Sequence, residues 1–142
     1  MNSPFELPQK PTILIVDDAP DNIMLLSALL KGRYKVKIAT DGAKALQIAA
    51  IAPHPDLILL DVMMPEMDGF ETCRRLKANA DIAEIPVIFL TARIEPEDEE
   101  KGLRLGAADY IPKPISPPVV LARVTTQLEL KDAREQLKSQ QH

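Results

Sequence analysis

Short runs of apolar residues recur along the chain. Unbroken runs occupy residues 13–16, 57–60 and 86–90, and a shorter strand pattern occupies 109–112. Runs without alternation are typical of strands that are buried on both faces, as in a parallel sheet. Residues 34–39 instead alternate apolar side chains with lysines, which predicts a half-exposed strand at an edge of the sheet. The pattern therefore predicts five strands.

Between these runs, apolar residues return every three or four positions, which predicts helices. Such segments begin near Pro20, after a capping position at Asp41, and at Gly69. A fourth predicted helix starts in the acidic segment 93–100 and has few apolar residues besides Leu103, so we expect it to be mobile. Strands that alternate with helices predict an α/β fold with a doubly wound parallel sheet and right-handed crossovers.

The last predicted helix begins near Ser116 and is longer than the sheet needs. Its apolar residues fall on two faces, one made by Leu121, Val124 and Leu128 and the other by Leu130, Ala133 and Leu137. At about 100° per residue the second face lies roughly opposite the first, so only the first can pack on the sheet. We expect the distal half to project and to meet a second copy of the chain or a downstream domain; a frayed tail is the plain alternative.

These patterns divide the chain into three parts. Residues 1–10 lack periodicity and are predicted to be a flexible leader, and residues 11–128 form one domain. Residues 129–142 are predicted to be a helical extension that links the domain to a partner chain or to an output domain.

The composition excludes several classes of protein. The chain has 142 residues, the size of one domain, and a formal charge of −4 without a basic run, which argues against direct contact with nucleic acid. No apolar run approaches the roughly 20 residues that span a bilayer, and no secretory signal begins the chain. The single cysteine, Cys73, can form no intramolecular disulfide, which fits a cytoplasmic location.

Carboxylates follow two of the predicted buried strands. Asp61 comes directly after residues 57–60, and Asp17 and Asp18 follow residues 12–16. In an open parallel sheet the ligand crevice lies at the carboxyl ends of the strands, so neighbouring strands would bring these acids together. Carboxylates at such short distances repel one another unless one of them is protonated or a cation lies between them. Mg²⁺ prefers oxygen ligands of this kind. The alternative is that these acids only cap the helices that follow.

A hydroxyl and an amine end two further strands. Thr91 follows residues 86–90, and Lys113 follows residues 109–112. Carboxylates, a metal ion, a hydroxyl and an ammonium group at one sheet edge suit a phosphoryl group, whose charge the metal and the ammonium would neutralise.

Taken together, these residues resemble the receiver domain of two-component response regulators. The resemblance covers about residues 11–130 and is carried by the two acids at 17–18, by Asp61 with the segment 64–69, by Thr91 and by Lys113 with its following proline. It implies a flavodoxin-like fold whose five parallel strands have the order 2-1-3-4-5.

The resemblance also implies a role for each site residue. Asp61 would accept a phosphoryl group from a phosphohistidine, and Thr91 and Lys113 would bind the phosphoryl oxygens. Tyr110 would be the switch aromatic that turns inward when Thr91 moves. The implied ligands of Mg²⁺ are Asp18, Asp61, the backbone carbonyl of Met63 and, directly or through water, Asp17. The implied protein is a switch rather than an enzyme, and its switching face would be formed by the fourth helix, the fifth strand and the last helix.

The implied partners are a sensor histidine kinase or a phosphotransfer protein, with a C-terminal output domain or a homodimer formed through the last helix. Residues 113–124 look similar to receivers that are fused to enzymes of cyclic di-GMP, particularly HD-type phosphodiesterases. Nothing in the chain after Leu130 suggests a helix-turn-helix or a second catalytic motif.

Two other functions use similar residues. A phosphatase with an aspartate nucleophile would need an acid two residues after Asp61, where this chain has Met63. A flavin-binding protein of the same fold would need a hydroxyl-rich phosphate loop after the first strand, where this chain has acids, and it would use a tryptophan that this chain lacks.

Overall fold

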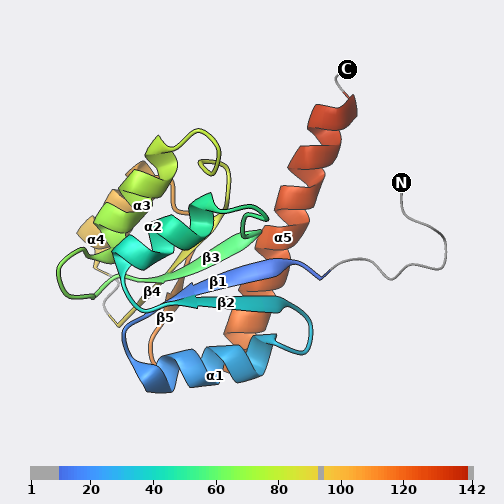
Figure 1. The fold of residues 1–142 in the computed structure, drawn as a ribbon. Helices are drawn as coiled ribbons and strands as arrows, with labels where there is room; N and C mark the ends of the chain where they lie inside the picture. Colours follow the sequence, from blue (N-terminus) through green and yellow to red (C-terminus); the bar gives the residue numbers. More distant parts are fainter. Residues whose placement is uncertain (1–9, 93–94, 141–142) are drawn as a thin grey trace.

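A single parallel sheet organises the chain. In a computed structural model, which describes residues 10–92 and 95–140, five strands have the order β2-β1-β3-β4-β5 (Figure 1). The strands are β1 (Thr12–Val16), β2 (Lys35–Ala39), β3 (Leu57–Asp61), β4 (Val87–Thr91) and β5 (Asp109–Pro112). The helices are α1 (Pro20–Leu30), α2 (Gly42–Ala50), α3 (Gly69–Ala78), α4 (Pro96–Arg104) and α5 (Pro117–Gln140). The predicted fold class and strand order are therefore confirmed, whereas most of the predicted leader lies outside the described residues.

The helices form two layers that cover opposite faces of the sheet (Figure 1). Along β1, Leu14 and Val16 face the core shared with α2 and α3, whereas Ile13 and Ile15 face the core shared with α1 and α5. Successive side chains of a strand point to opposite faces, so an inner strand between two layers needs apolar residues at every position. This requirement explains the unbroken apolar runs of the sequence.

Aspartates begin two of the helices. The Asp41 side chain accepts a hydrogen bond from the Lys44 backbone N–H at 2.8 Å, and Asp68 accepts one from the Glu71 N–H at the same distance. Each carboxylate satisfies an N–H group that has no partner within its helix. The predicted cap at Asp41 is thus confirmed.

The packing of α4 differs from the prediction. Leu103, expected to anchor this helix, is 61% exposed, and the one residue of α4 that is buried is Gly102. Residues 93 and 94, which were expected to belong to this helix, lie outside the described residues. Gly102 faces the sheet, and the side chain of Tyr110 occupies the space directly beneath this glycine.

The extended last helix is confirmed. Val120 and Val124 are fully buried against the sheet, whereas Leu130 and Leu137 on the second apolar face are 51% and 60% exposed. In Figure 1 the distal half of α5 continues past the sheet, so the second face has no sheet beneath it.

Ion pairs nevertheless connect the distal half of α5 to the domain. The Lys131 ammonium lies 3.2 Å from Asp56, whose other carboxylate oxygen accepts a hydrogen bond from the Thr12 N–H at 2.7 Å. Further along, Lys138 pairs with Glu84 in the segment before β4. These contacts, which the sequence did not predict, connect the distal half of α5 to the segments before β3 and β4. Among the described residues, no helix is both long and apolar enough to cross a membrane.

The two-layer core can be tested by truncating one buried leucine. Leu59 is fully buried in the layer under α1 and α5. We expect Leu59→Ala to lower the free energy of unfolding by about 2–5 kcal/mol in urea titrations, since it removes buried methyl groups and leaves a cavity. The matched control is Leu137→Ala, which should change this free energy by less than about 0.5 kcal/mol because Leu137 is largely exposed. Equal losses in the two variants would contradict this packing.

Candidate functional site

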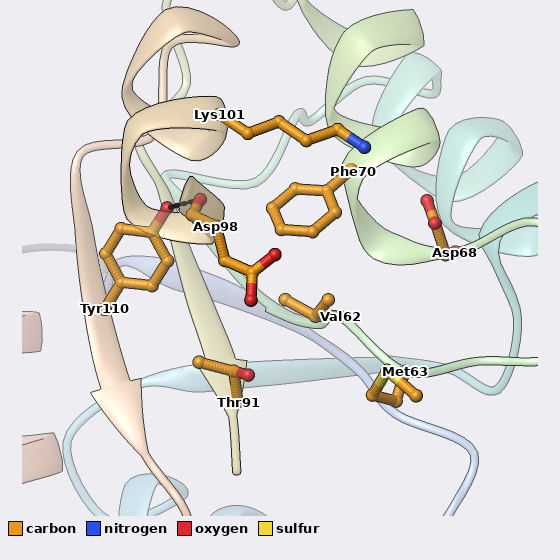
Figure 2. Close-up of a pocket in the computed structure, with 8 residues that line it drawn as sticks. All are labelled: Val62, Met63, Asp68, Phe70, Thr91, Asp98, Lys101 and Tyr110. Atoms are coloured by element: carbon orange, nitrogen blue, oxygen red, sulfur yellow. Dashed lines mark hydrogen bonds between the residues drawn. The ribbon is translucent and has the colours of Figure 1, made fainter. Parts of the chain in front are cut away.

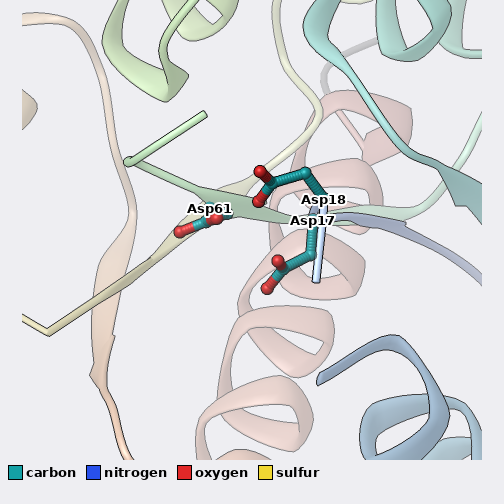
Figure 3. A group of neighbouring side chains, drawn as sticks. All are labelled: Asp17, Asp18 and Asp61. Carbon is teal, nitrogen blue, oxygen red and sulfur yellow. The ribbon is translucent and has the colours of Figure 1, made fainter. Parts of the chain in front are cut away.

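The parallel register of β1 and β3 brings three carboxylates together. Val16 lies opposite Leu60, so Asp17 and Asp18 emerge beside Asp61 at the carboxyl edge of the sheet (Figure 3). One oxygen from each of the three side chains lies within 4.8 Å of the others. The structure therefore joins residues that are more than 40 positions apart in the sequence, as predicted.

Lys113, which follows the edge strand β5, reaches this group of carboxylates. The Lys113 ammonium lies 3.0 Å from Oδ1 of Asp61 and 3.3 Å from Oδ2 of Asp17. Its backbone N–H donates to the carbonyl of Thr91 at 2.9 Å, so the end of β4 positions the start of the Lys113 loop. Among the described residues, the Lys113 ammonium is thus the cation that faces two buried carboxylates.

Burial and hydrogen bonding differ among the three acids. Asp17 is fully buried and Asp61 is 2% exposed, whereas Asp18 is exposed. Oδ1 of Asp17 accepts from the Ala19 N–H at 2.9 Å, and Oδ1 of Asp61 accepts from the Met63 N–H at 3.3 Å. Oδ2 of Asp17 accepts no hydrogen bond from any described residue, although it is buried.

This donor set fits a hard divalent cation. Oδ2 of Asp17 is buried and accepts no hydrogen bond from the described residues; its ion-pair partner there is the Lys113 ammonium at 3.3 Å, and a cation bound between the acids would give it a further one. Carboxylate oxygens are the ligands that Mg²⁺ prefers, and the exposed Asp18 leaves a side open for water or a substrate oxygen. Asp17, Asp18 and Asp61 could therefore hold Mg²⁺; the role of the Met63 carbonyl stays a prediction, and the Met63 side chain is 70% exposed.

The surroundings shift the proton affinity of the site. Burial raises the pKa of Asp61 from its usual 3.8 to about 6; the hydrogen bond from Lys113 opposes this shift, and the charge of Asp17 adds to it. Burial disfavours the charged form of Lys113, but the hydrogen bond to Asp61 and the two carboxylate charges outweigh burial and raise its pKa. An aspartate with so high a pKa is a frequent property of functional sites.

Gly69 lets the loop after β3 fold tightly over the site. Its N–H donates to the carbonyl of Val62 at 2.9 Å. A Cβ atom at position 69 would lie 2.3 Å from the carbonyl oxygen of Asp61, closer than nonbonded atoms can approach. Only glycine therefore allows α3 to begin directly against the backbone of Asp61.

A recess of about 230 Å³ opens beside the acids, between α3, α4 and the ends of β4 and β5 (Figure 2). Its lining comprises Val62, Met63, Asp68, Phe70, Thr91, Asp98, Lys101 and Tyr110. Thr91 lies at the end of β4 and is 4% exposed, and its role in binding a phosphoryl oxygen stays a prediction. The sequence did not identify Asp98 and Lys101, because the acidic start of α4 has the composition of a solvated helix turn.

Tyr110 points inward and forms one wall of this recess. Its one hydroxyl proton is shared between the backbone carbonyls of Asp98 and Glu99, which lie 3.0 and 3.1 Å from the hydroxyl oxygen. In this conformation the ring is 7% exposed and lies in the inward position that the resemblance implies for one state of the switch. Burial raises the pKa of the Tyr110 hydroxyl, and the charges of Glu99 and Asp98 add to the effect.

Comparison with known proteins adds to this geometry. The sequence model described as the response regulator receiver domain matches residues 13–125. A probable cyclic di-GMP phosphodiesterase of Vibrio cholerae is 49% identical over 129 residues, which are 91% of this chain and 29% of that protein. Response regulator PleD of Caulobacter vibrioides is 43% identical over 130 residues, which are 91% of this chain and 28% of that protein. The chain thus spans less than a third of the length of these relatives.

Solved structures agree with the sequence comparison. The receiver domain of an HD domain-containing protein from Pseudomonas fluorescens Pf-5 is 25% identical with a TM-score of 0.82, and the match covers 92% of this chain and 96% of that one. The receiver domain of a sensor histidine kinase from Pseudomonas aeruginosa PAO1 is 30% identical with a TM-score of 0.77, covering 84% and 98%. That structure has a magnesium ion coordinated in its active site cleft.

The raised pKa of Asp61 predicts how stability depends on pH. Between about pH 7 and about pH 5 the folded protein takes up a proton on Asp61, whereas the unfolded chain, with a pKa near 3.8, largely does not. The free energy of unfolding of the metal-free protein should therefore rise by about 1 kcal/mol as the pH falls through this interval.

Urea titrations in the presence of a chelator would measure this rise. Asp61→Asn is the matched control, because an amide of the same shape does not titrate and its stability should not increase over this interval. A rise of the same size in both proteins would assign the effect to another group.

Proposed function

Because this chain belongs to the response regulator receiver domain family, we propose that it is a phosphorylation-activated switch whose phosphoacceptor is Asp61. The observation that carries the proposal is the arrangement around this carboxylate. Asp61 is buried, two further acids lie within reach of one cation, and the Lys113 ammonium contacts it at 3.0 Å.

The chemistry needs little more than alignment. An Asp61 carboxylate oxygen attacks the phosphorus of a phosphohistidine, the P–N bond breaks, and its electron pair leaves with the imidazole. The transition state is loose, so positioning and charge neutralisation supply most of the catalysis. Mg²⁺, held by Asp17, Asp18, Asp61 and the Met63 carbonyl, would neutralise charge on the phosphoryl oxygens.

Lys113 and Thr91 would stabilise the product. Lys113 already contacts Asp61, so its ammonium needs only a small movement to reach a phosphoryl oxygen on that residue. The Thr91 hydroxyl, at the end of the neighbouring strand, can donate a hydrogen bond to a second oxygen. An acyl phosphate on Asp61 adds negative charge beside Lys113 and Thr91, and both side chains can move to bind its oxygens.

Direct contacts support a switching face made of α4, β5 and α5. The Tyr110 hydroxyl bonds to two carbonyls of α4, and Arg123 of α5 donates to the backbone carbonyl of Tyr110. A movement of β5 would therefore change its contacts with both α4 and α5. Phosphorylation shifts such an equilibrium only through contacts that differ between the two states, and Thr91 and Tyr110 would supply them.

The partners follow from the family and from the shape of the chain. We assign a sensor histidine kinase or a phosphotransfer protein as phosphodonor, in the cytoplasm. We divide the chain into a receiver domain at residues 11–128 and an extension at 129–142. Leu130 and Leu137 on that extension would contact a second copy or an output domain, and the relatives named above favour an output linked to cyclic di-GMP.

Phosphorylation of the purified chain tests the acceptor. With acetyl phosphate and Mg²⁺, intact mass spectrometry should show one added phosphoryl group, and chelation of Mg²⁺ should suppress it. Asp61→Ala should abolish the addition because it removes the nucleophile. The matched control is Asp41→Asn, at an exposed helix cap outside the site, which should be labelled like the parent. Labelling that survives in Asp61→Ala would move the acceptor elsewhere.

Truncation tests the extension. If the exposed apolar face of α5 pairs with a second copy, removing the residues after Leu128 should lower the mass measured by light scattering and leave phosphorylation intact. Leu130→Glu combined with Leu137→Glu should have the same effect at full length, because charges at these positions oppose helix pairing. An unchanged mass in both variants would rule out pairing through this face and leave a frayed tail or contact with an output domain.

A further inference from the structure

A row of aromatic rings crosses the domain beneath α4. Phe70 of α3 packs edge-on against Phe89 of β4, with 5.1 Å between the ring centroids, and Phe89 packs against Tyr110 of β5 at 5.6 Å. Tyr110 completes the row by reaching the backbone of α4, where its hydroxyl contacts the carbonyl of Asp98 (Figure 2) and also that of Glu99. The inward position of Tyr110 thus requires the ring to approach the helix backbone itself.

Gly102 is the residue of α4 at this approach. A Cβ atom at position 102 would lie 1.7 Å from the Tyr110 hydroxyl oxygen, 2.8 Å from its Cζ and 3.2 Å from Cε2 of Phe89. Phe89 is fully buried and cannot move away. Any side chain at position 102 therefore excludes the inward ring unless α4 shifts.

Backbone conformation does not explain this glycine. Gly106 has a φ of +94°, which favours glycine, but Gly102 lies within α4, where glycine is a poor helix former. It is also the one residue of α4 that is buried. The space that Gly102 leaves, and not its conformational freedom, accounts for its position.

We propose that Gly102 is a positioning residue for the switch: its missing side chain makes the space into which Tyr110 turns, so the residue at position 102 decides whether Tyr110 lies inward. Gly102 touches neither the acidic cluster nor Lys113. A side chain there would leave the acceptor chemistry intact and break the link between β5 and α4. This last consequence rests on the proposed function, whereas the steric exclusion does not.

The position of Tyr110 can be observed directly. Tyr34→Phe leaves Tyr110 as the single tyrosine, which can then be labelled as 3-fluorotyrosine and followed by fluorine NMR. In this parent we expect a signal that a soluble paramagnetic agent barely broadens. Gly102→Ala should make the signal several-fold more sensitive to the agent, because the ring is driven to solvent. The matched control is Gly32→Ala, where an added Cβ meets nothing within 4 Å, and its signal should match that of the parent.

A Tyr110 signal that stays protected in Gly102→Ala would overturn the proposal. If Gly102→Ala does not fold, the double variant Gly102→Ala with Tyr110→Leu decides the matter, since the shorter side chain no longer reaches the helix. Folding of the double variant supports the steric exclusion, and its failure to fold overturns it.

Phosphorylation is measured on the same samples, so the two proposals fail separately. We expect Gly102→Ala to gain one phosphoryl group from acetyl phosphate with Mg²⁺, as the parent does. A parent that gains none would refute the proposed function and leave the steric test standing. Loss of labelling in Gly102→Ala alone would refute a role limited to positioning Tyr110.

Discussion

The confinement of like charges at one edge of the sheet is the constraint on which the rest of the structure depends. Asp17 and Asp61 are buried side by side, and within the described part of the chain these two carboxylates share one ammonium group, that of Lys113. Such a cluster is stable only if the backbone holds it rigidly, and the paired ends of β1 and β3 do so. Burial raises the pKa of Asp61, the charge of Asp17 adds to this effect, and the clustered carboxylates suit the binding of a cation.

The fold connects this cluster to a distant surface through a short series of contacts. Thr91 ends the strand next to Asp61, Tyr110 lies on the following strand, and its hydroxyl reaches the first turns of α4. Arg123 joins the same strand to α5. The Tyr110 ring is buried, whereas the Arg123 side chain is 38% exposed, so the contacts of β5 with α4 and α5 differ in burial. Gly102 makes room for the residue at the centre of the series.

The last helix serves two purposes along its length. Its first half is core, with Val120 and Val124 closing the layer under the sheet. Its second half is connected to the domain by the ion pair of Lys131 with Asp56 and presents apolar residues to solvent. Asp56 also accepts a hydrogen bond from the Thr12 N–H, so its ion pair with Lys131 connects the extension to the start of β1.

The sequence by itself determined the alternation of strands and helices, the two-sided burial of the inner strands and the acids, threonine and lysine at the strand ends, because these depend on local periodicity and on the polarity of each position. Only the tertiary structure decided which side chains meet across elements. The inward hydroxyl of Tyr110, the exposure of Leu103 and the pairing of Lys131 with Asp56 each depend on how one element is rotated against another. That rotation is set by packing between segments distant in sequence, and a glycine in a helix pattern, such as Gly102, shows its purpose only when the neighbouring ring is in place.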